Sequence, residues 1–208
     1  MRYRSRFAAA CFVCAAMIWA TQSLAAEVII GSVLAVRGEV FRGDDAKQSP
    51  LAAKAPVYLG DTIVSGTGKA KIALNDGTII SVGENTRLRL SMYQSTSNNL
   101  TTRLNVWAGV LRLLVARVTS GGHFEIESET AIAAVRGTDW LMDVTADTTS
   151  VAIITGAVAV SSTARPGATV MLDTPGHGTD VGRGAAPTTP HAWGAQRFAK
   201  TLERANFE

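Results

Sequence analysis

The stretch KAKIALNDGTIISV, residues 69–82, decides the fold of this chain. In its first half Ala70, Ile72 and Leu74 share one face, and other residues alternate with them. Alternation with a period of two is typical of a strand that is buried on one side only. Asp76-Gly77 then joins this run to a second one, and an Asp-Gly dipeptide between two such runs predicts a β-hairpin with a type I′ turn.

Similar short runs continue on both sides of the hairpin. Residues 87–92 alternate strictly, and apolar or β-branched runs fill residues 100–107, 110–118 and 151–161, with breaks that contain glycine between them. Roughly a dozen such strands, with a turn signal about every 8–12 residues and no long helical period, predict an all-β domain over residues 27–162.

Three glycines indicate how these strands are arranged. Gly38, Gly109 and Gly156 each open a strand. This weak repetition predicts a chain that coils into a solenoid-like or roll arrangement. The spacing between the glycines is uneven, so a true sequence repeat is not expected.

The last part of the chain, residues 163–208, is predicted to be a C-terminal extension. A strand over residues 169–173 and a turn at 175–178 predict a hairpin. A linker rich in Gly, Pro and Thr follows at residues 182–190.

A short helix is expected to close this extension. Thr189 can cap it, Pro190 suits its first position, and the helical pattern runs to about Arg204. The stripe that would dock this helix on the sheet is narrow and comprises Trp193, Arg197, Phe198 and Leu202.

Residues 1–25 are predicted to be a secretory signal peptide. Arg2, Arg4 and Arg6 precede an unbroken apolar run at residues 7–20, and Ser-Leu-Ala follows before the expected cleavage site. A helix that spans a bilayer needs roughly 20 apolar residues, and this run is shorter. We therefore expect cleavage after Ala25 or Ala26, a periplasmic location, and no membrane span in the mature chain.

Removal of this peptide would change the chemistry of the chain. Cys11 and Cys14 both lie inside it, so the mature chain has no cysteine for disulfides, thiolate catalysis or metal binding. The peptide also carries three of the 20 Lys and Arg residues, whereas all 17 Asp and Glu residues follow it. A mature net charge near zero gives no electrostatic basis for binding nucleic acid or an anionic membrane.

Three carboxylates are the sharpest candidate for chemistry. Glu125, Glu127 and Glu129 lie on one face of a predicted strand, where they could bind Ca²⁺ or act as a glycosidase pair. No Asp-Gly metal loop accompanies them, so a solvated edge strand is the preferred interpretation.

The other polar residues do not form a recognisable catalytic or metal motif. The three histidines (His123, His177 and His191) lack the spacing of metal ligands, and no Gly-x-Ser-x-Gly or Ser-x-x-Lys motif is present. Four arginines are interpreted as solvent-exposed residues on one face of a sheet and not as a nucleic-acid-binding surface. They are Arg87, Arg89, Arg103 and Arg112. We predict that the chain is not an enzyme and has no catalytic residue, cofactor or metal.

The order of several blocks resembles the FecR domain family. The blocks are GSVLAVRG (31–38), GDTI (60–63), AKIALNDGT (70–78), LNVWAG (104–109), AAVRGTDW (133–140) and TGAVAV (155–160). The resemblance covers roughly residues 31–162. It implies a twisted, two-layered, β-solenoid-like domain in the periplasm, of a kind whose best-known members relay a signal from an outer-membrane receptor to a cytoplasmic sigma factor.

The residues shared with that family are expected to have structural roles. Glycines at turns would favour positive φ angles, and aspartates beside them would accept neighbouring backbone N–H groups. Arg136-Gly137-Thr138 would separate two strands, with Arg136 bound to carbonyl groups or to an acid such as Asp139. The full set comprises Gly60, Asp61, Asp76, Gly77, Arg136, Gly137 and Thr138.

Two functions remain open from the sequence. Family regulators carry a sigma-binding segment and a transmembrane helix before the domain, whereas only a short signal is expected here, so direct anti-sigma activity is not predicted. The preferred hypothesis is a non-catalytic interaction or sensor module in envelope signalling or assembly. Its partner would be an envelope protein, such as an outer-membrane receptor, that could add a strand at a sheet edge. The alternative is a carbohydrate- or peptidoglycan-binding module with Trp107 and Trp140 as candidate stacking residues, although core positions are the preferred interpretation of both tryptophans.

Overall fold

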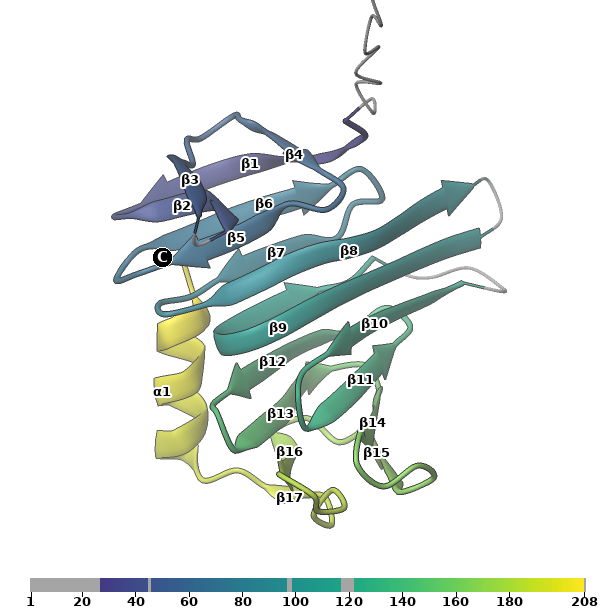
Figure 1. Ribbon diagram of the computed structural model, residues 1–208. Helices are drawn as coiled ribbons and strands as arrows, with labels where there is room; N and C mark the ends of the chain where they lie inside the picture. Colours follow the sequence, from purple (N-terminus) through teal and green to yellow (C-terminus); the bar gives the residue numbers. More distant parts are fainter. Residues whose placement is uncertain (1–26, 45, 97–98, 117–121, 208) are drawn as a thin grey trace, which may run out of the picture.

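Seventeen strands form two facing β-sheets in the computed structural model of the chain (Figure 1). The structure describes residues 27–207 except 45, 97–98 and 117–121. The predicted signal peptide lies outside the described residues. The all-β prediction, with a twisted two-layered arrangement and a short C-terminal helix, is confirmed.

The first layer, sheet A, contains nine of the described strands. In spatial order these are β4 (Pro56–Tyr58), β1 (Ile29–Arg37), β6 (Lys69–Leu74), β7 (Ile79–Val82), β9 (Asn99–Leu114), β12 (Asp139–Val144), β13 (Thr148–Thr155), β16 (His177–Gly182) and β17 (His191–Ala192).

The second layer, sheet B, shares β9 with the first. Its spatial order is β3 (Lys47–Pro50), β2 (Val40–Asp44), β5 (Thr62–Ser65), β8 (Arg87–Thr96), β9, β10 (His123–Glu127), β11 (Ala131–Val135), β14 (Val158–Ser162) and β15 (Thr169–Leu172). Among the described pairings, only that between β9 and β10 is parallel.

The hydrophobic core fills the space between the layers. Strands of both sheets alternate buried and more exposed positions, as β6 and β11 show most clearly, and the buried positions are apolar. Burying one large apolar side chain contributes roughly 1.5–3 kcal/mol, so this core is the main source of stability. Its completely buried large members include Ile72, Ile80, Leu88, Leu104, Leu113, Phe124 and Trp140.

The predicted hairpin forms between β6 and β7, but its turn is of another type. Leu74 N–H donates to Thr78 O (2.9 Å), and Gly77 N–H donates to Leu74 O (3.0 Å), which makes a three-residue loop. A type I′ turn needs positive φ at both central residues, whereas Gly77 (φ +88°) is the one residue of this loop with positive φ. The turn is therefore type I followed by a left-handed glycine, and the type I′ prediction was wrong.

Gly109 is the point where β9 passes from sheet B to sheet A. The sequence predicted two strands separated at Gly109, whereas the structure has one continuous strand that ends at Leu114. Gly109 has φ +100°, and a Cβ atom there would lie 2.2 Å from Thr86 Oγ1. Only glycine fits this crossing, because it has both the required φ and no side chain.

The C-terminal extension adds strands to both layers. Strand β15 pairs with β14 in sheet B, and β16 pairs with β13 in sheet A, so the predicted hairpin between them does not form. Residues 173–176 instead carry the chain across from one layer to the other.

The helix α1 (Ala195–Ala205) is shorter than predicted and begins after Gly194. It cannot begin at Pro190, because His191 and Ala192 pair with β16 and the Trp193 N–H donates to Gly176 O (2.9 Å). No helix in the described residues has both the length and the apolar character needed to cross a bilayer.

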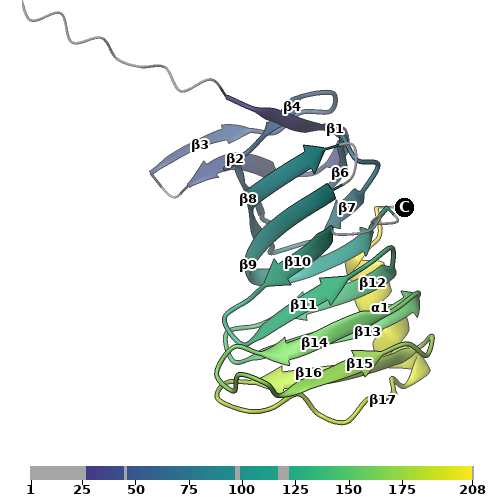
Figure 2. The same cartoon turned by 90° about the vertical axis from the view of Figure 1, so that its right-hand side faces the viewer.

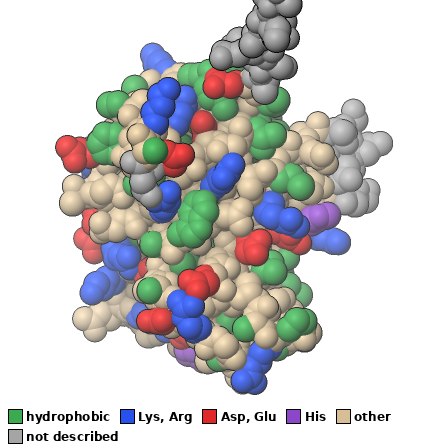
Figure 3. Space-filling model, viewed as in Figure 1, with side chains coloured by type: hydrophobic (Ala, Val, Ile, Leu, Met, Phe, Trp, Pro, Cys, Tyr) green, Lys and Arg blue, Asp and Glu red, His purple; other side chains and the backbone are tan. Residues whose placement is uncertain are grey.

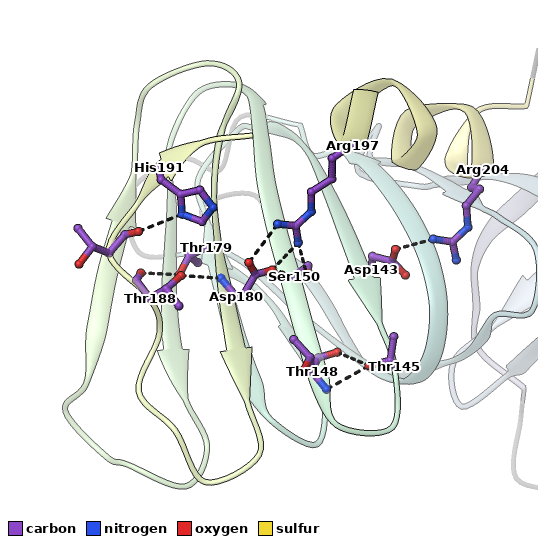
Figure 4. A network of polar contacts seen from close by, with 11 residues as sticks. Asp143, Thr145, Thr148, Ser150, Thr179, Asp180, Thr188, His191, Arg197 and Arg204 are labelled. Carbon is purple, nitrogen blue, oxygen red and sulfur yellow. Dashed lines mark hydrogen bonds and ion pairs between the residues drawn. The ribbon is translucent and has the colours of Figure 1, made fainter. Parts of the chain in front are cut away.

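Helix α1 packs on the outer face of sheet A. Trp193 and Ala205 contact Val110, Leu141 and Ala152, with Phe198 and Leu202 partly buried against them, so the predicted docking is confirmed. Two ion pairs hold the helix from its polar side, Arg197 with Asp180 and Arg204 with Asp143 (Figure 4). Figure 2 shows sheet B in front and α1 behind, so the helix leaves sheet B uncovered.

Candidate functional site

The outer face of sheet B, from β8 to β15, is not covered by any other helix or strand of the described residues (Figure 2). We call it the open face. Its side chains are those that alternate with the buried core positions of sheet B. They include Arg89, Arg103, Asn105, Trp107, Glu125, Glu127, Ile132, Ala134, Ala159 and Met171.

The half of the open face over β9 and β10 is polar. Because these strands pair in parallel, Arg103 lies opposite Glu125 and Asn105 lies opposite Glu127. Arg103 Nη2 binds Glu125 Oε2 at 3.0 Å, and Asn105 Nδ2 donates to Glu127 Oε2 at 3.4 Å. Strand β10 is paired on both sides, so the prediction that its glutamates lie on an edge strand was wrong.

The half of the open face over β11, β14 and β15 is mainly apolar. Pairing aligns Ala134 with Ala159 and Ala159 with Met171, and Met171 is 55% exposed. Together with His123 and Arg136 at one end, these residues line a shallow depression of about 330 Å³. Small side chains in a row let the backbone or side chains of another protein approach closely.

Strand β15 is the open edge of this apolar half. It has the sequence TVML, without proline or charge, and β14 is its only partner among the described strands. The other three outer strands are blunted by features that natural sheets use against unwanted pairing: β3 contains Lys47 and Pro50, β4 begins with Pro56, and β17 has two residues.

Trp107 and Trp140 occupy opposite environments. Trp140 is completely buried in the core, as the preferred interpretation had it, so it is excluded as a stacking residue of the carbohydrate-binding alternative. Trp107 is 49% exposed on the open face, with the Arg87 guanidinium 5.5 Å from its ring centre. Surface depressions of about 330 and 310 Å³ border this ring.

Gly60 and Asp61 lie in the turn between β4 and β5. Gly60 is exposed with φ +90°. Asp61 Oδ2 accepts a hydrogen bond from the Tyr58 N–H (2.9 Å) and lies 3.0 Å from Arg42 Nε. Burial raises the pKa of Asp61 above its ordinary value, although the Tyr58 hydrogen bond and the Arg42 charge act in the opposite direction. Asp76 acts similarly in the hairpin, where its side chain accepts from the Thr78 N–H (3.1 Å).

The Arg136-Gly137-Thr138 segment joins β11 in sheet B to β12 in sheet A. Gly137 has φ +80°, and the buried Thr138 donates its hydroxyl to Ala157 O (2.9 Å). Arg136 is exposed beside the apolar depression. Its expected partner, Asp139, is bound instead by Arg112 through two hydrogen bonds of 3.0 and 2.8 Å.

The remaining candidates do not converge on a catalytic or metal site. His123 lies on β10, whereas His177 and His191 lie on β16 and β17 in the other layer. Within the described ranges, no three His, Cys, Asp or Glu side chains gather as metal ligands would. Acidic and basic side chains are interspersed on the face shown in Figure 3, without a field of one sign.

The apolar half of the open face was not identified from the sequence. Ala134, Ala159 and Met171 are far apart along the chain and meet only through the pairing of three strands. A weak signal did exist: each lies at an outward position of an alternating strand, where a polar residue is the usual choice.

Comparison with known proteins supports the fold. Residues 61–159 match the sequence model of the family described as FecR protein. No curated protein matches the chain. Two crystal structures of a "putative anti-sigma factor" from Parabacteroides distasonis are similar, each with a TM-score of 0.54 and 20% sequence identity. The match covers 67% of this chain and 62% of the Parabacteroides chain.

Proposed function

Because the chain carries a FecR domain at residues 61–159, we propose that it is an exported, non-catalytic interaction module of envelope signalling. It receives an extended segment of an envelope protein on the apolar half of the open face, with β15 as the pairing strand. The family match and the similar fold of the Parabacteroides protein, described as a candidate anti-sigma factor, support a regulatory role.

Export is supported by the sequence of the N-terminal segment. Residues 1–25 combine a basic start, a short apolar run and small residues before a cleavage site. Both cysteines lie within this segment, so the mature chain suits an oxidising compartment. The proposed location is the periplasm.

The open edge at β15 is the single observation that carries this proposal. Ser162 N–H donates to Ala168 O (3.1 Å) at the start of the β14–β15 pair. Antiparallel pairs alternate between bonded and non-bonded sites, so Val170 faces β14 while Thr169 and Met171 direct their backbone groups outward. An added strand would pair with these two residues and lay its side chains beside those of Thr169 and Met171.

The proposal is tested by crosslinking at the open edge. A photoreactive residue at Met171 is expected to capture a discrete envelope protein, whereas the same residue at exposed Lys200 on α1 is not. Capture from both positions, or from neither, would contradict the proposed surface.

Proline substitutions distinguish strand addition from simple contact. Met171→Pro removes an outward N–H without breaking a bond to β14, so it is expected to abolish capture at a neighbouring probe with little loss of stability. Val170→Pro breaks the bond to β14 and is expected to lower the melting temperature. Unchanged capture by the folded Met171→Pro variant would exclude strand pairing.

A further inference from the structure

Trp107 stands on the open face as a half-exposed aromatic ring with different neighbours on its two sides. Strands β8 and β10 flank β9 on opposite sides. From β8, the Arg87 guanidinium approaches the ring, 5.5 Å from its centre. Toward β10, the ring borders a depression of about 330 Å³ that is also lined by Asn105, Glu127 and Glu129.

We propose that this depression binds one sugar ring of an uncharged glycan, with the ring packed against Trp107. One face of a pyranose presents C–H groups, which pack well on the indole surface, while its rim presents hydroxyl groups that need hydrogen-bond partners. The depression lies near the lower end of the roughly 300–1,000 Å³ found for ligand sites. A single sugar unit suits this size better than a larger organic molecule.

Glu127 supplies the hydrogen-bond acceptor. Its carboxylate receives one long hydrogen bond from Asn105 (3.4 Å), and no cation in the described part of the chain pairs with it. It therefore has lone pairs left for sugar hydroxyls, and carboxylates form strong hydrogen bonds. Glu129 on the far side is already bound by Arg183 and serves as the wall of the site.

The same carboxylate limits which ligands fit. An unpaired negative charge beside the ring disfavours phosphates, nucleic acids and acidic sugars by repulsion. A cationic side chain of a protein would be attracted to both the carboxylate and the indole face. A neutral sugar uses the ring and also the amide of Asn105, which a cation does not need, so the glycan is the occupant that uses the whole site.

Fluorescence titration with an N-acetylglucosamine trisaccharide tests the site. Trp140 and Trp193 are 0% and 6% exposed, so a saturable change reports mainly on Trp107. The trisaccharide is expected to bind and to protect the indole from iodide quenching. Sedimentation with insoluble chitin, an uncharged polymer of N-acetylglucosamine, provides a second readout, independent of fluorescence.

Three variants locate the binding. Trp107→Ala is expected to weaken chitin binding at least about tenfold, and Glu127→Gln to weaken trisaccharide binding several-fold, because each removes one of the two contacts. Lys200→Ala, at an exposed position of α1, is expected to leave both unchanged. Melting temperatures establish that each variant is folded.

Failure of this proposal is separable from failure of the protein-partner proposal. Absence of saturable binding by the wild-type protein, or binding that survives Trp107→Ala, overturns the glycan site. Tighter binding of an arginine-containing peptide than of the trisaccharide overturns it in favour of a cationic ligand. Crosslinking at Met171 tests the protein partner and does not depend on any of these results.

Discussion

At the scale of single residues, a strict requirement lies at Gly109. Its backbone must take a positive φ for β9 to pass between the sheets, and Thr86 occupies the space where a side chain would begin. The Thr86 hydroxyl is itself fixed there, because it accepts a hydrogen bond from the Val110 N–H (3.0 Å). One glycine therefore satisfies a conformational and a steric demand together.

Replacing Gly109 by alanine is expected to lower the free energy of unfolding by about 3 kcal/mol or more. Backbone strain at positive φ contributes roughly 1–3 kcal/mol, and overpacking against Thr86 a further 1–3 kcal/mol. Gly60→Ala is the matched control, because Gly60 has φ +90° but nothing within 4 Å of the added Cβ. Urea denaturation of both variants measures the difference; equal losses would show that the contact with Thr86 contributes nothing.

Local chemistry explains which single residues were predictable. Gly77 follows an aspartate between two alternating runs, so its place in a turn is evident from four neighbouring residues. Gly109 was recognised only as an interruption, because its role depends on Thr86, which precedes it by more than twenty positions. For Trp140 the core was the preferred interpretation, but its complete burial depends on both sheets and could not be derived from its neighbours in the sequence.

At the scale of elements, α1 depends on polar contacts as much as on its narrow apolar stripe. Arg197 binds Asp180 and also the Ser150 hydroxyl (3.0 Å). Burial alone would raise the pKa of Asp180, but the hydrogen bonds from Arg197 and Ser150, together with the Arg197 charge, hold it below its ordinary value of 3.8. The ionised carboxylate therefore stabilises the docked helix.

Acid is expected to remove this contribution. A carboxylate whose pKa is lowered by folding adds stability above pH 3.8 that is lost as the pH falls from 3.8 through the lower value of the folded state. Asp180→Asn should therefore destabilise the protein at pH 7, by less than about 1 kcal/mol because the pair is partly exposed, and by less still at pH 3.

Asp173→Asn provides the comparison for this pH effect, because Asp173 is exposed and bonds only to its neighbour Thr174 in the described contacts. Thermal unfolding at both pH values measures the two variants. An Asp180→Asn deficit that is equal at pH 3 and pH 7 would contradict the charge-based role of this carboxylate.

The helix also shows why element boundaries were less predictable than element types. Thr189 and Pro190 have the local chemistry of a helix start, yet His191 and Ala192 pair with β16 and delay the helix to Ala195. Pairing with a distant strand outweighed local propensity. Similarly, the turn at residues 175–178 was predicted, but whether it returns within one sheet or crosses to the other depends on the whole fold.

At the scale of the whole molecule, the order of turns and alternating runs was enough to predict an all-β domain, and the resemblance to the FecR family implied its two layers of strands. The identity of the uncovered layer was not predictable, because it depends on where α1 docks. Because α1 docks on sheet A, the outer face of sheet B stays exposed. This face carries both the apolar row of Ala134, Ala159 and Met171 and the ring of Trp107. The two proposed ligands therefore share a face but occupy different halves of it.

Export is testable on the whole protein. The chain recovered from the periplasm is expected to begin at Ala26 or Glu27, which mass spectrometry of the intact protein measures. Val13→Arg, which places a charge in the apolar run, is expected to leave the full-length chain in the cytosol, whereas Val13→Leu should be exported normally. A wild-type protein that keeps residues 1–25 would contradict the predicted cleavage.

The sharing of β9 has a consequence for how the molecule can be divided. Residues 99–108 complete sheet B beside β10, and residues 109–114 complete sheet A beside β7. A fragment that stops at residue 108 leaves β7 paired with β6 alone, and the complementary fragment leaves β10 paired with β11 alone. Each fragment contains the part of β9 that completes a sheet of the other fragment. The two fragments would therefore regain the native structure only by associating with each other.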